Sequence, residues 1–289
     1  MRVLVIGASG MLGSAMMRVL GSDSSCELWG AVRDPRVLEN FPAQQRPRLL
    51  PGVDVLDIDR LTQALDASRP QVIINCVGVV KQLTDAEDPL VTVPINALFP
   101  HRLARLGAVM GARIVHVSTD CVFSGRRGMY VESDISDAED LYGKSKFIGE
   151  VNNLDQVVTL RTSIIGHELG SVHGLVDWFL SQTKEVRGYA NAVFSGLPTV
   201  EFASVIKDFV LPRSDLHGLY HVSAAPISKL NLLRLIASQY DKTIQIVPDE
   251  NPIIDRSLRG DRFREITGYV APSWPTLVKR MFDDFHSRT

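Results

Sequence analysis

The stretch Gly7-Ala8-Ser9-Gly10-Met11-Leu12-Gly13 follows an apolar run at residues 3–6 and precedes a helical pattern that begins at Met11. Gly7 allows a sharp turn, Gly10 lets the backbone approach a pyrophosphate, and Gly13 lets the helix pack closely on the strand. The N–H groups at the start of the helix attract an anion. This spacing predicts a dinucleotide-binding turn, with a tight turn without ligand as the alternative. The residues expected around the phosphates are Gly7, Ser9, Gly10, Met11, Leu12 and Gly13.

Strand and helix patterns alternate through the first half of the chain. Apolar runs predict strands at residues 3–6, 27–32, 48–53, 71–75, 113–118 and 157–161. Helical periodicity lies between them at residues 11–20, 58–67 (with Asp57 as N-cap), 94–110 and 140–152. This alternation predicts a parallel sheet covered by helices on both faces, and right-handed crossovers make it doubly wound.

The pattern is looser after Gly166. We expect helices at residues 175–183, 201–211, 228–240 and from about Pro275, a strand at 218–222 and a loop at 194–199. The predicted fold class is therefore α/β: a Rossmann-type doubly wound parallel sheet with a smaller C-terminal substrate-binding lobe. We expect residues 1–165 with about 199–222 to form the dinucleotide-binding domain. The remaining residues, about 166–198 and 223–289, are expected to form the lobe.

The composition indicates which classes of molecule the protein is not expected to bind. The chain has 289 residues, 45% of them hydrophobic and 22% charged, as in folded globular proteins. Its formal net charge is -2 without a long basic run, which argues against nucleic acid or an anionic membrane surface as partner. The longest apolar stretch, residues 72–80, is too short to span a bilayer. Three widely spaced cysteines and a first strand that begins at residue 2 predict a cytoplasmic protein without disulfides. A homodimer is compatible with the sequence, although no pattern indicates an interface.

The ends of the second and third predicted strands are expected to bind the adenosine half of a dinucleotide. Arg33 and Asp34 follow the second strand, where an arginine pairs with a 2′-phosphate and an acid binds the ribose hydroxyls of NAD. Because Arg33 comes first, we favour NADP(H) and keep NAD(H) open, with Arg33 then a solvated surface residue. Asp54 and Val55 follow the third strand, where a carboxylate can accept a hydrogen bond from the adenine amino group. The chain is also expected to pass the cofactor after the fourth strand, at Cys76, Val77 and Gly78.

Tyr142 and Lys146 lie four residues apart, on one face of a predicted helix. A free tyrosine has a pKa of about 10, and a neighbouring ammonium lowers that pKa toward the working range. Such a pair can protonate a carbonyl oxygen while a hydride reaches its carbon. Ser118 and Thr119 end the fifth strand, at the sheet edge where ligands bind, so the Thr119 hydroxyl can bond the same oxygen. A tyrosine packed against a lysine stem is the structural alternative.

This ordered set of glycine turn, Thr119, Tyr142 and Lys146 resembles the extended branch of the short-chain dehydrogenase/reductase superfamily. The closer resemblance, over nearly the whole chain, is to the dTDP-4-dehydrorhamnose reductase family. Its members read S-T-D-Y-V-F-x-G where this chain reads Ser118-Thr119-Asp120-Cys121-Val122-Phe123-Ser124-Gly125. Further similar segments are Tyr130-Val131-Glu132-Ser133-Asp134, Leu141-Tyr142-Gly143-Lys144-Ser145-Lys146, Gly149-Glu150, Leu160-Arg161-Thr162-Ser163 with Gly166, and Ser195-Gly196-Leu197-Pro198-Thr199.

The resemblance implies an NADPH-dependent oxidoreductase that reduces the C4 keto group of a nucleotide-linked 4-keto-6-deoxy sugar, in surface-polysaccharide or deoxysugar biosynthesis. It assigns proton donation to Tyr142. Lys146 tunes Tyr142 and holds the nicotinamide ribose, Thr119 orients the carbonyl, and Ser118 lies beside the cofactor. The implied partner is a nucleotide-sugar substrate.

Two segments depart from the family pattern. Cys121 stands where that family usually has tyrosine and where sugar-nucleotide 4,6-dehydratases have glutamate, so dehydration lacks its usual base. A small packing residue explains this cysteine better than a thiol nucleophile does. The segment His167-Glu168-Leu169-Gly170 also differs. These departures suggest a sister group that acts on a related nucleotide sugar, such as a UDP-linked N-acetylated 6-deoxy-4-hexulose.

The resemblance places the nucleotide sugar between the two parts of the chain. Each candidate has a packing or surface role as its alternative. The candidates are Asp120, Cys121, His167, His173, Trp178, Ser195, Arg256 and Arg262. His167, Glu168 and His173 do not have the spacing of a zinc motif, so no metal is expected.

Two other functions stay open at this stage. The regulatory beta subunit of methionine adenosyltransferase resembles these reductases, so the chain could be a non-catalytic NADP-binding subunit. The presence of Thr119, Tyr142 and Lys146 argues against this. A sugar-nucleotide epimerase is the other alternative, and it would keep NAD tightly bound.

Overall fold

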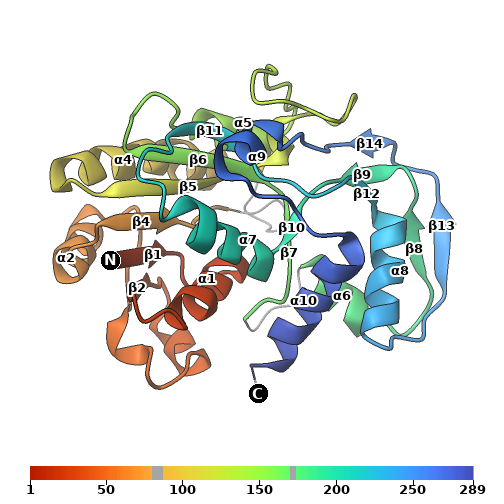
Figure 1. Ribbon diagram of the computed structural model, residues 1–289, viewed down its shortest axis with the longest axis horizontal. Coiled ribbons are helices and arrows are strands. Elements are labelled where there is room, and N and C mark those ends of the chain that lie inside the picture. The colour runs from red at the N-terminus through yellow and green to blue at the C-terminus, as the bar shows by residue number, and fades with distance from the viewer. Residues whose placement is uncertain (80–86, 170–173, 289) are drawn as a thin grey trace.

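The computed structural model describes residues 1–79, 87–169 and 174–288 (Figure 1). Within them, a central sheet of seven strands has the order β11-β6-β5-β4-β1-β2-β3, and every neighbouring pair is parallel. The strands are β1 (Arg2–Ile6), β2 (Glu27–Ala31), β3 (Leu49–Leu50), β4 (Val72–Asn75), β5 (Arg113–Thr119), β6 (Val157–Thr162) and β11 (Gly218–His221). The predicted Rossmann-type doubly wound sheet is confirmed.

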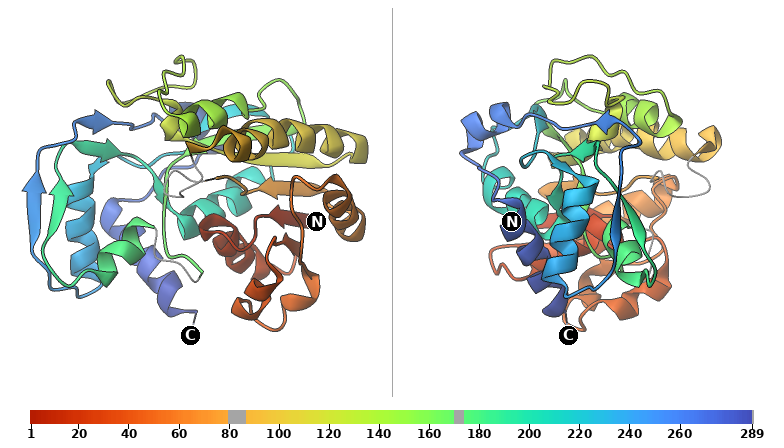
Figure 2. Two further views of the ribbon diagram at one scale, coloured as in Figure 1. Left: turned by 180° about the vertical axis from the view of Figure 1, so that it is seen from behind. Right: turned by 90° about the vertical axis from the view of Figure 1, so that its right-hand side faces the viewer.

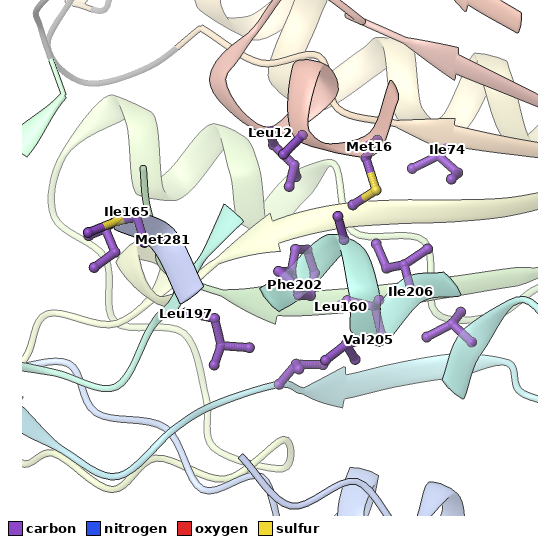
Figure 3. Close-up of a cluster of buried hydrophobic side chains, with 14 of the residues drawn as sticks. Leu12, Met16, Ile74, Leu160, Ile165, Leu197, Phe202, Val205, Ile206 and Met281 are labelled. Atoms are coloured by element: carbon purple, nitrogen blue, oxygen red, sulfur yellow. The ribbon is translucent and has the colours of Figure 1, made fainter. Parts of the chain in front are cut away.

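Helices cover both faces of this sheet because both faces of its strands are apolar. Successive residues of a strand point to opposite faces, and so Ile74 packs in one core cluster while its neighbour Ile73 packs in another. The first cluster lies under α1 (Met11–Gly21), α7 (Thr199–Val205) and α10 (Trp274–His286). Figure 3 shows Leu12 and Met16 of α1 facing Phe202 of α7 across it. On the opposite face lie α2 (Ile58–Ser68), α4 (Phe99–Met110) and α5 (Leu141–Ile148) (Figure 2).

Short strands and helices beside the main sheet form the second part of the fold, at the right of Figure 1. β8 (Val186–Tyr189) pairs with β13 (Ile246–Asp249), and β9 (Ala192–Phe194) pairs with both β12 (Ile227–Ser228) and β14 (Ile254–Asp255). β10 (Leu197–Pro198) pairs with β7 (Ile164–Ile165). The helices of this part are α6 (Leu175–Ser181), α8 (Lys229–Gln239) and α9 (Asp261–Thr267).

Four predicted elements were wrong in part. The loop expected at 194–199 contains β10, which pairs with β7 because Gly196 lets the chain come close to Ser163, the residue before β7: a Cβ on Gly196 would lie 2.3 Å from the Ser163 carbonyl oxygen. The helix expected at 140–152 is α5, which ends at Ile148. Gly149 follows it and packs against the carbonyl oxygen of Asn96, 1.9 Å from where a Cβ would stand.

The helix expected at 94–110 is divided. A short α3 (Pro89–Thr92) leads into the π-helical turn η4 (Val93–Leu98), and α4 follows. Pro100 has no N–H to bond the carbonyl of Asn96 four residues earlier, which disfavours a regular α-helix at this point. The helix expected at 201–211 likewise combines α7 with the π-helical turn η6 (Ile206–Val210).

None of the helices in residues 1–79, 87–169 and 174–288 is long and apolar enough to cross a bilayer.

Candidate active site

The strand order reverses between β1 and β4, and ligands of doubly wound sheets bind at such a point. The register pairs Ile6 with Asn75, so the turn after β1 and the chain after β4 leave the sheet at the same edge. A cavity of about 610 Å³ opens there. Its walls come from the β1–α1 turn, the ends of β4, β5 and β6, α5, and the second part of the fold.

The turn after β1 has the shape that a dinucleotide phosphate requires. Gly7 has φ +80°, which side chains rarely adopt, and a Cβ on Gly13 would lie 2.0 Å from the Gly7 carbonyl oxygen. Gly10 caps α1 without a side-chain hydrogen bond, and the first turn of α1 has no acidic residue. The N–H groups at this helix start are therefore available to an anion. These residues fit the pyrophosphate of a dinucleotide.

The cavity brings together most of the residues that the sequence predicted for the site. Most residues expected to bind the cofactor line it together with the candidate catalytic residues Thr119, Tyr142 and Lys146, and Asp120 and Cys121 follow Thr119 in the lining. Predicted residues that line the cavity are Ser9, Gly10, Met11, Leu12, Cys76, Val77, Gly78, Ser118, Thr119, Asp120, Cys121, Tyr142, Lys146 and Arg256.

Close packing of α5 on the end of β5 sets the geometry of the catalytic set. A Cβ on Gly143 would lie 2.2 Å from the Cys121 carbonyl oxygen, so only glycine lets α5 come this near. Asp140 begins the helix by accepting a hydrogen bond of 2.7 Å from the Gly143 N–H. Tyr142 thereby faces Thr119, whose hydroxyl donates to Asp120 Oδ1 (3.2 Å) and accepts from the Cys121 N–H (3.1 Å).

The expected lowering of the Tyr142 pKa by Lys146 was wrong. Burial raises the pKa of the Tyr142 phenol above its usual value, the neighbouring Cys121 adds to this, and a hydrogen bond with Thr119 opposes it. The phenol therefore keeps its proton at neutral pH and can donate it. The Lys146 ammonium donates to the Val117 carbonyl oxygen (2.8 Å), and burial lowers its pKa to about 8, opposed by the negative charge of Glu150.

A buried ion pair lies behind the catalytic wall. Arg161 donates two hydrogen bonds of 2.7 Å to Glu150, and both side chains are at most 2% exposed. Glu150 also accepts a 2.7 Å bond from the Ser118 hydroxyl. Ser118 is therefore held by Glu150 while it lines the cavity. The Nη1 atom of Arg161 lies 3.3 Å from His221 Nε2, and the guanidinium packs over the ring of Phe123.

The predicted adenosine contacts lie outside the cavity lining, together with Gly7 and Gly13, which shape the turn beneath it. Arg33 is exposed. Asp34 accepts hydrogen bonds from the Arg36 side chain and N–H, so its carboxylate is occupied. Asp54 is exposed and accepts from the Leu56 N–H, and Val55 packs against the core cluster under α2.

Four predicted substrate contacts, His167, Ser195, Trp178 and Arg262, do not line the cavity. His167 is 1% exposed because its ring bonds Tyr240 and Asp177 and stacks on Phe285. Ser195 is 2% exposed and bonds the backbone of Leu258.

Trp178 lies on α6, 39% exposed and outside the lining. Arg262 packs over the ring of Tyr220. His173 lies outside the described residues. Within the described ranges, no group of three or more His, Cys, Asp or Glu could hold a metal ion.

Sequence reasoning missed the wall contributed by the second part of the fold. The residues concerned are mostly apolar and include one acid, Glu168, and one cation, Lys229 at the first position of α8. The available signal was its position directly after the N-cap Ser228, where a helix dipole disfavours positive charge. The missed lining residues of this wall are Ser163, Ile164, Ile165, Glu168, Leu169, Gly174, Leu175, Ala192, Val193, Phe194, Lys229 and Ile254, and Val79, Val117 and Thr162 line the cavity from the main sheet and the chain after it.

The RmlD substrate binding domain family matches residues 1–287. The chain belongs to this family. It is 25% identical to the dTDP-4-dehydrorhamnose reductase of Aggregatibacter actinomycetemcomitans over 96% of this chain and 88% of that protein. The predicted likeness to this family of the extended short-chain dehydrogenase/reductase superfamily is confirmed.

Of two further similarities, one covers only part of the chain and the other shows only the fold. The chain is 30% identical to methionine adenosyltransferase 2 subunit beta of Rattus norvegicus over 58% of its own length, and it spans about half (48%) of that protein. The dTDP-4-dehydrorhamnose reductase of Bacillus anthracis, solved in complex with NADP, superimposes with a TM-score of 0.79 at 23% identity. That superposition covers 98% of this chain and 99% of the other, and it shows the common fold.

Proposed function

We propose that the protein is an NADPH-dependent reductase of the C4 keto group of a nucleotide-linked 4-keto-6-deoxy sugar. The observation that carries the proposal is the convergence of Thr119, Tyr142 and Lys146 on one cavity that also contains the uncapped N-terminus of α1. Residues 1–165 with about 199–222 then form the cofactor half, and residues 166–198 with 223–289 form the substrate half. The UDP-linked N-acetylated sugar suggested by the departure from the family pattern at residues 167–170 is one candidate substrate.

The residues of the turn after β1 and the chain after β4 would hold the cofactor, which supplies a hydride when bound. Family members support this choice of cofactor, since the Bacillus anthracis reductase was solved with NADP. NADP is favoured over NAD because Arg33 is exposed while Asp34 is bonded to Arg36. NAD(H) remains the second choice.

Each catalytic side chain has a distinct task. The neutral Tyr142 phenol donates its proton to the substrate carbonyl oxygen as that oxygen gains electron density. The Thr119 hydroxyl orients the same oxygen. Lys146, whose ammonium is held by the Val117 carbonyl oxygen on the wall of the same cavity, would bind the nicotinamide ribose. Binding in a fixed orientation supplies the rest of the rate enhancement.

The similarity to methionine adenosyltransferase 2 subunit beta supports a second candidate, a dinucleotide-binding regulatory subunit. Reductase activity is tested by following NADPH consumption with a panel of dTDP- and UDP-linked 4-keto-6-deoxy sugars. Turnover of one panel member supports the reductase. NADPH binding without turnover, together with a stoichiometric partner protein in a pull-down, supports the regulatory subunit.

A further inference from the structure

Lys229 is a cation on the cavity wall that the proposed chemistry does not use. It is the first residue of α8 and lines the cavity from the second part of the fold. Its Nζ atom lies 3.9 Å from the centre of the Phe194 ring. Within residues 1–79, 87–169 and 174–288, its ammonium makes no hydrogen bond and no ion pair within 4.0 Å. Its three N–H donors are therefore available to a ligand.

The position of Lys229 is unfavourable for a lysine that serves stability alone. Burial lowers the pKa of its ammonium, which means that burial opposes the charged form. The positive end of the α8 dipole lies at the same place and adds to the penalty. The Asp120 charge opposes this lowering of the pKa without forming an ion pair within 4.0 Å, and the Phe194 ring adds a cation–π contact of about 0.5–2 kcal/mol, so the ammonium stays destabilised by burial. An anionic ligand group would satisfy both the charge and the donors.

Arg256 is a second cation of the same wall. It follows β14, and its Nε atom donates to the Phe123 carbonyl oxygen at 2.8 Å. That bond fixes the guanidinium and leaves its terminal nitrogens without a hydrogen bond to the described part of the chain. Burial raises the pKa of the Asp120 carboxyl, and the charges of Arg256 and Lys229 oppose that rise, so both cations lie near this carboxyl. The charged residues that line the cavity in the described part of the chain are the cations Lys146, Lys229 and Arg256 and the acids Asp120 and Glu168, which leaves one positive charge in excess.

We propose that Lys229 and Arg256 form an anion subsite that binds the diphosphate of the nucleotide-sugar substrate, with Lys229 as a determinant of substrate affinity. This inference rests on the proposed function for the identity of the ligand. A diphosphate offers oxygens to both cations at once, and charge-assisted bonds to phosphate are among the stronger hydrogen bonds in proteins. The cofactor phosphates have a separate place at the start of α1, in the other part of the fold.

Calorimetry on the full-length, NADPH-saturated protein tests the subsite directly. The ligands are UDP, dTDP, inorganic pyrophosphate, and uridine and thymidine as phosphate-free controls. Lys229→Met should weaken the better-bound nucleoside diphosphate by about 10- to 100-fold, because a hydrogen bond to a charged group contributes about 1.5–3 kcal/mol. Binding of the nucleosides should not change. Lys229→Arg should retain most of the affinity, and Lys184→Met, on an exposed lysine of the same part of the fold, should behave as wild type.

Kinetics separate affinity from chemistry. With a substrate that the wild type reduces, Lys229→Met should raise KM about as much as it weakens diphosphate binding and should leave kcat within about threefold. An unchanged diphosphate affinity in a folded Lys229→Met protein overturns the proposal. So does an equal loss of NADPH affinity, which would assign Lys229 to the cofactor.

Two controls keep the test decisive. If circular dichroism shows that Lys229→Met does not fold, binding is measured on the wild-type protein alone. A wild type that binds none of UDP, dTDP and pyrophosphate overturns the subsite. If no keto sugar is reduced but diphosphate binding depends on Lys229, the proposed reduction fails and the anion subsite stands.

Discussion

Glu150 accepts two 2.7 Å hydrogen bonds from Arg161 and a third from the hydroxyl of Ser118, a residue of the cavity wall. The ion pair is almost completely buried, at 1% and 2% exposure of the two side chains. It joins the chain after α5 to β6, next to the strand that ends in Thr119. The same contacts therefore stabilise the fold and position the wall of the cavity that contains Ser118 and Thr119.

Removing one partner of this pair should be strongly destabilising. Glu150→Ala leaves the buried Arg161 charge unpaired, and we expect a loss of about 3–5 kcal/mol in the free energy of unfolding. Chemical denaturation measures it. The double replacement Glu150→Met with Arg161→Met should recover much of the loss, since no buried charge remains unpaired. A loss below about 1 kcal/mol in Glu150→Ala would contradict the role of the pair.

Gly13 and Gly10 provide a matched pair of substitutions in the phosphate turn. Gly13→Ala should destabilise the fold by about 1–3 kcal/mol, because its Cβ would meet the Gly7 carbonyl oxygen at 2.0 Å. Gly10→Ala meets that oxygen only at 3.4 Å, so the protein should fold normally and lose NADPH affinity instead. Thermal melts and cofactor fluorescence distinguish the two effects. Equal melting temperatures for both variants would refute the packing argument.

Tyr142→Phe should lower kcat by at least about 100-fold, since it removes the proton donor and leaves the ring in place. Cofactor affinity should stay within a few-fold of wild type, because the variant leaves Lys146 and the phosphate turn intact. Stopped-flow reduction and NADPH fluorescence titration provide the two readouts. Retained turnover would remove Tyr142 from the mechanism.

The pH dependence should follow Lys146, whose pKa burial lowers from 10.5 to about 8. The ammonium is protonated below this pKa and neutral above it, so kcat should fall as the pH rises through about 8. The free energy of unfolding should instead increase as the pH rises above about 8. The unfolded state binds more protons between about pH 8 and 10.5, and this group therefore stabilises the fold increasingly as the pH rises through that window. A pH–rate profile with parallel thermal melts checks both signs. Activity that stays constant well above pH 8 would show that the charge of Lys146 is not needed.

Cys121 should be chemically inert despite its place in the cavity. Burial raises the pKa of its thiol to about 12, so little thiolate exists at neutral pH. We expect iodoacetamide to modify it on the order of 1,000-fold more slowly than a small free thiol, as followed by mass spectrometry of the peptide. Cys121→Ser should keep kcat within about threefold. Rapid alkylation that a nucleoside diphosphate prevents would instead indicate a reactive cysteine.

Local patterns were sufficient for the main sheet and the cofactor side of the candidate site. The phosphate turn, the strand end at Thr119 and the spacing of Tyr142 and Lys146 are each contained in a few neighbouring residues. Their strands and helices alternate in an order that leaves one sheet edge for all of them. Local patterns were therefore enough to predict the doubly wound fold and to bring the candidate catalytic residues Thr119, Tyr142 and Lys146 to one cavity.

The second wall of the cavity depends on contacts between segments that are far apart in the sequence. Lys229 and Phe194 reach it through pairing of β9 with β12 and β14, three short strands that no periodicity indicated. His167 shows the converse, since its motif position suggested a ligand contact and its packing against Tyr240 and Phe285 removes it from the cavity. The physical reason is the same in both cases. Contacts between distant segments depend on how whole elements pack, and a side chain's own neighbours in the sequence do not record that packing.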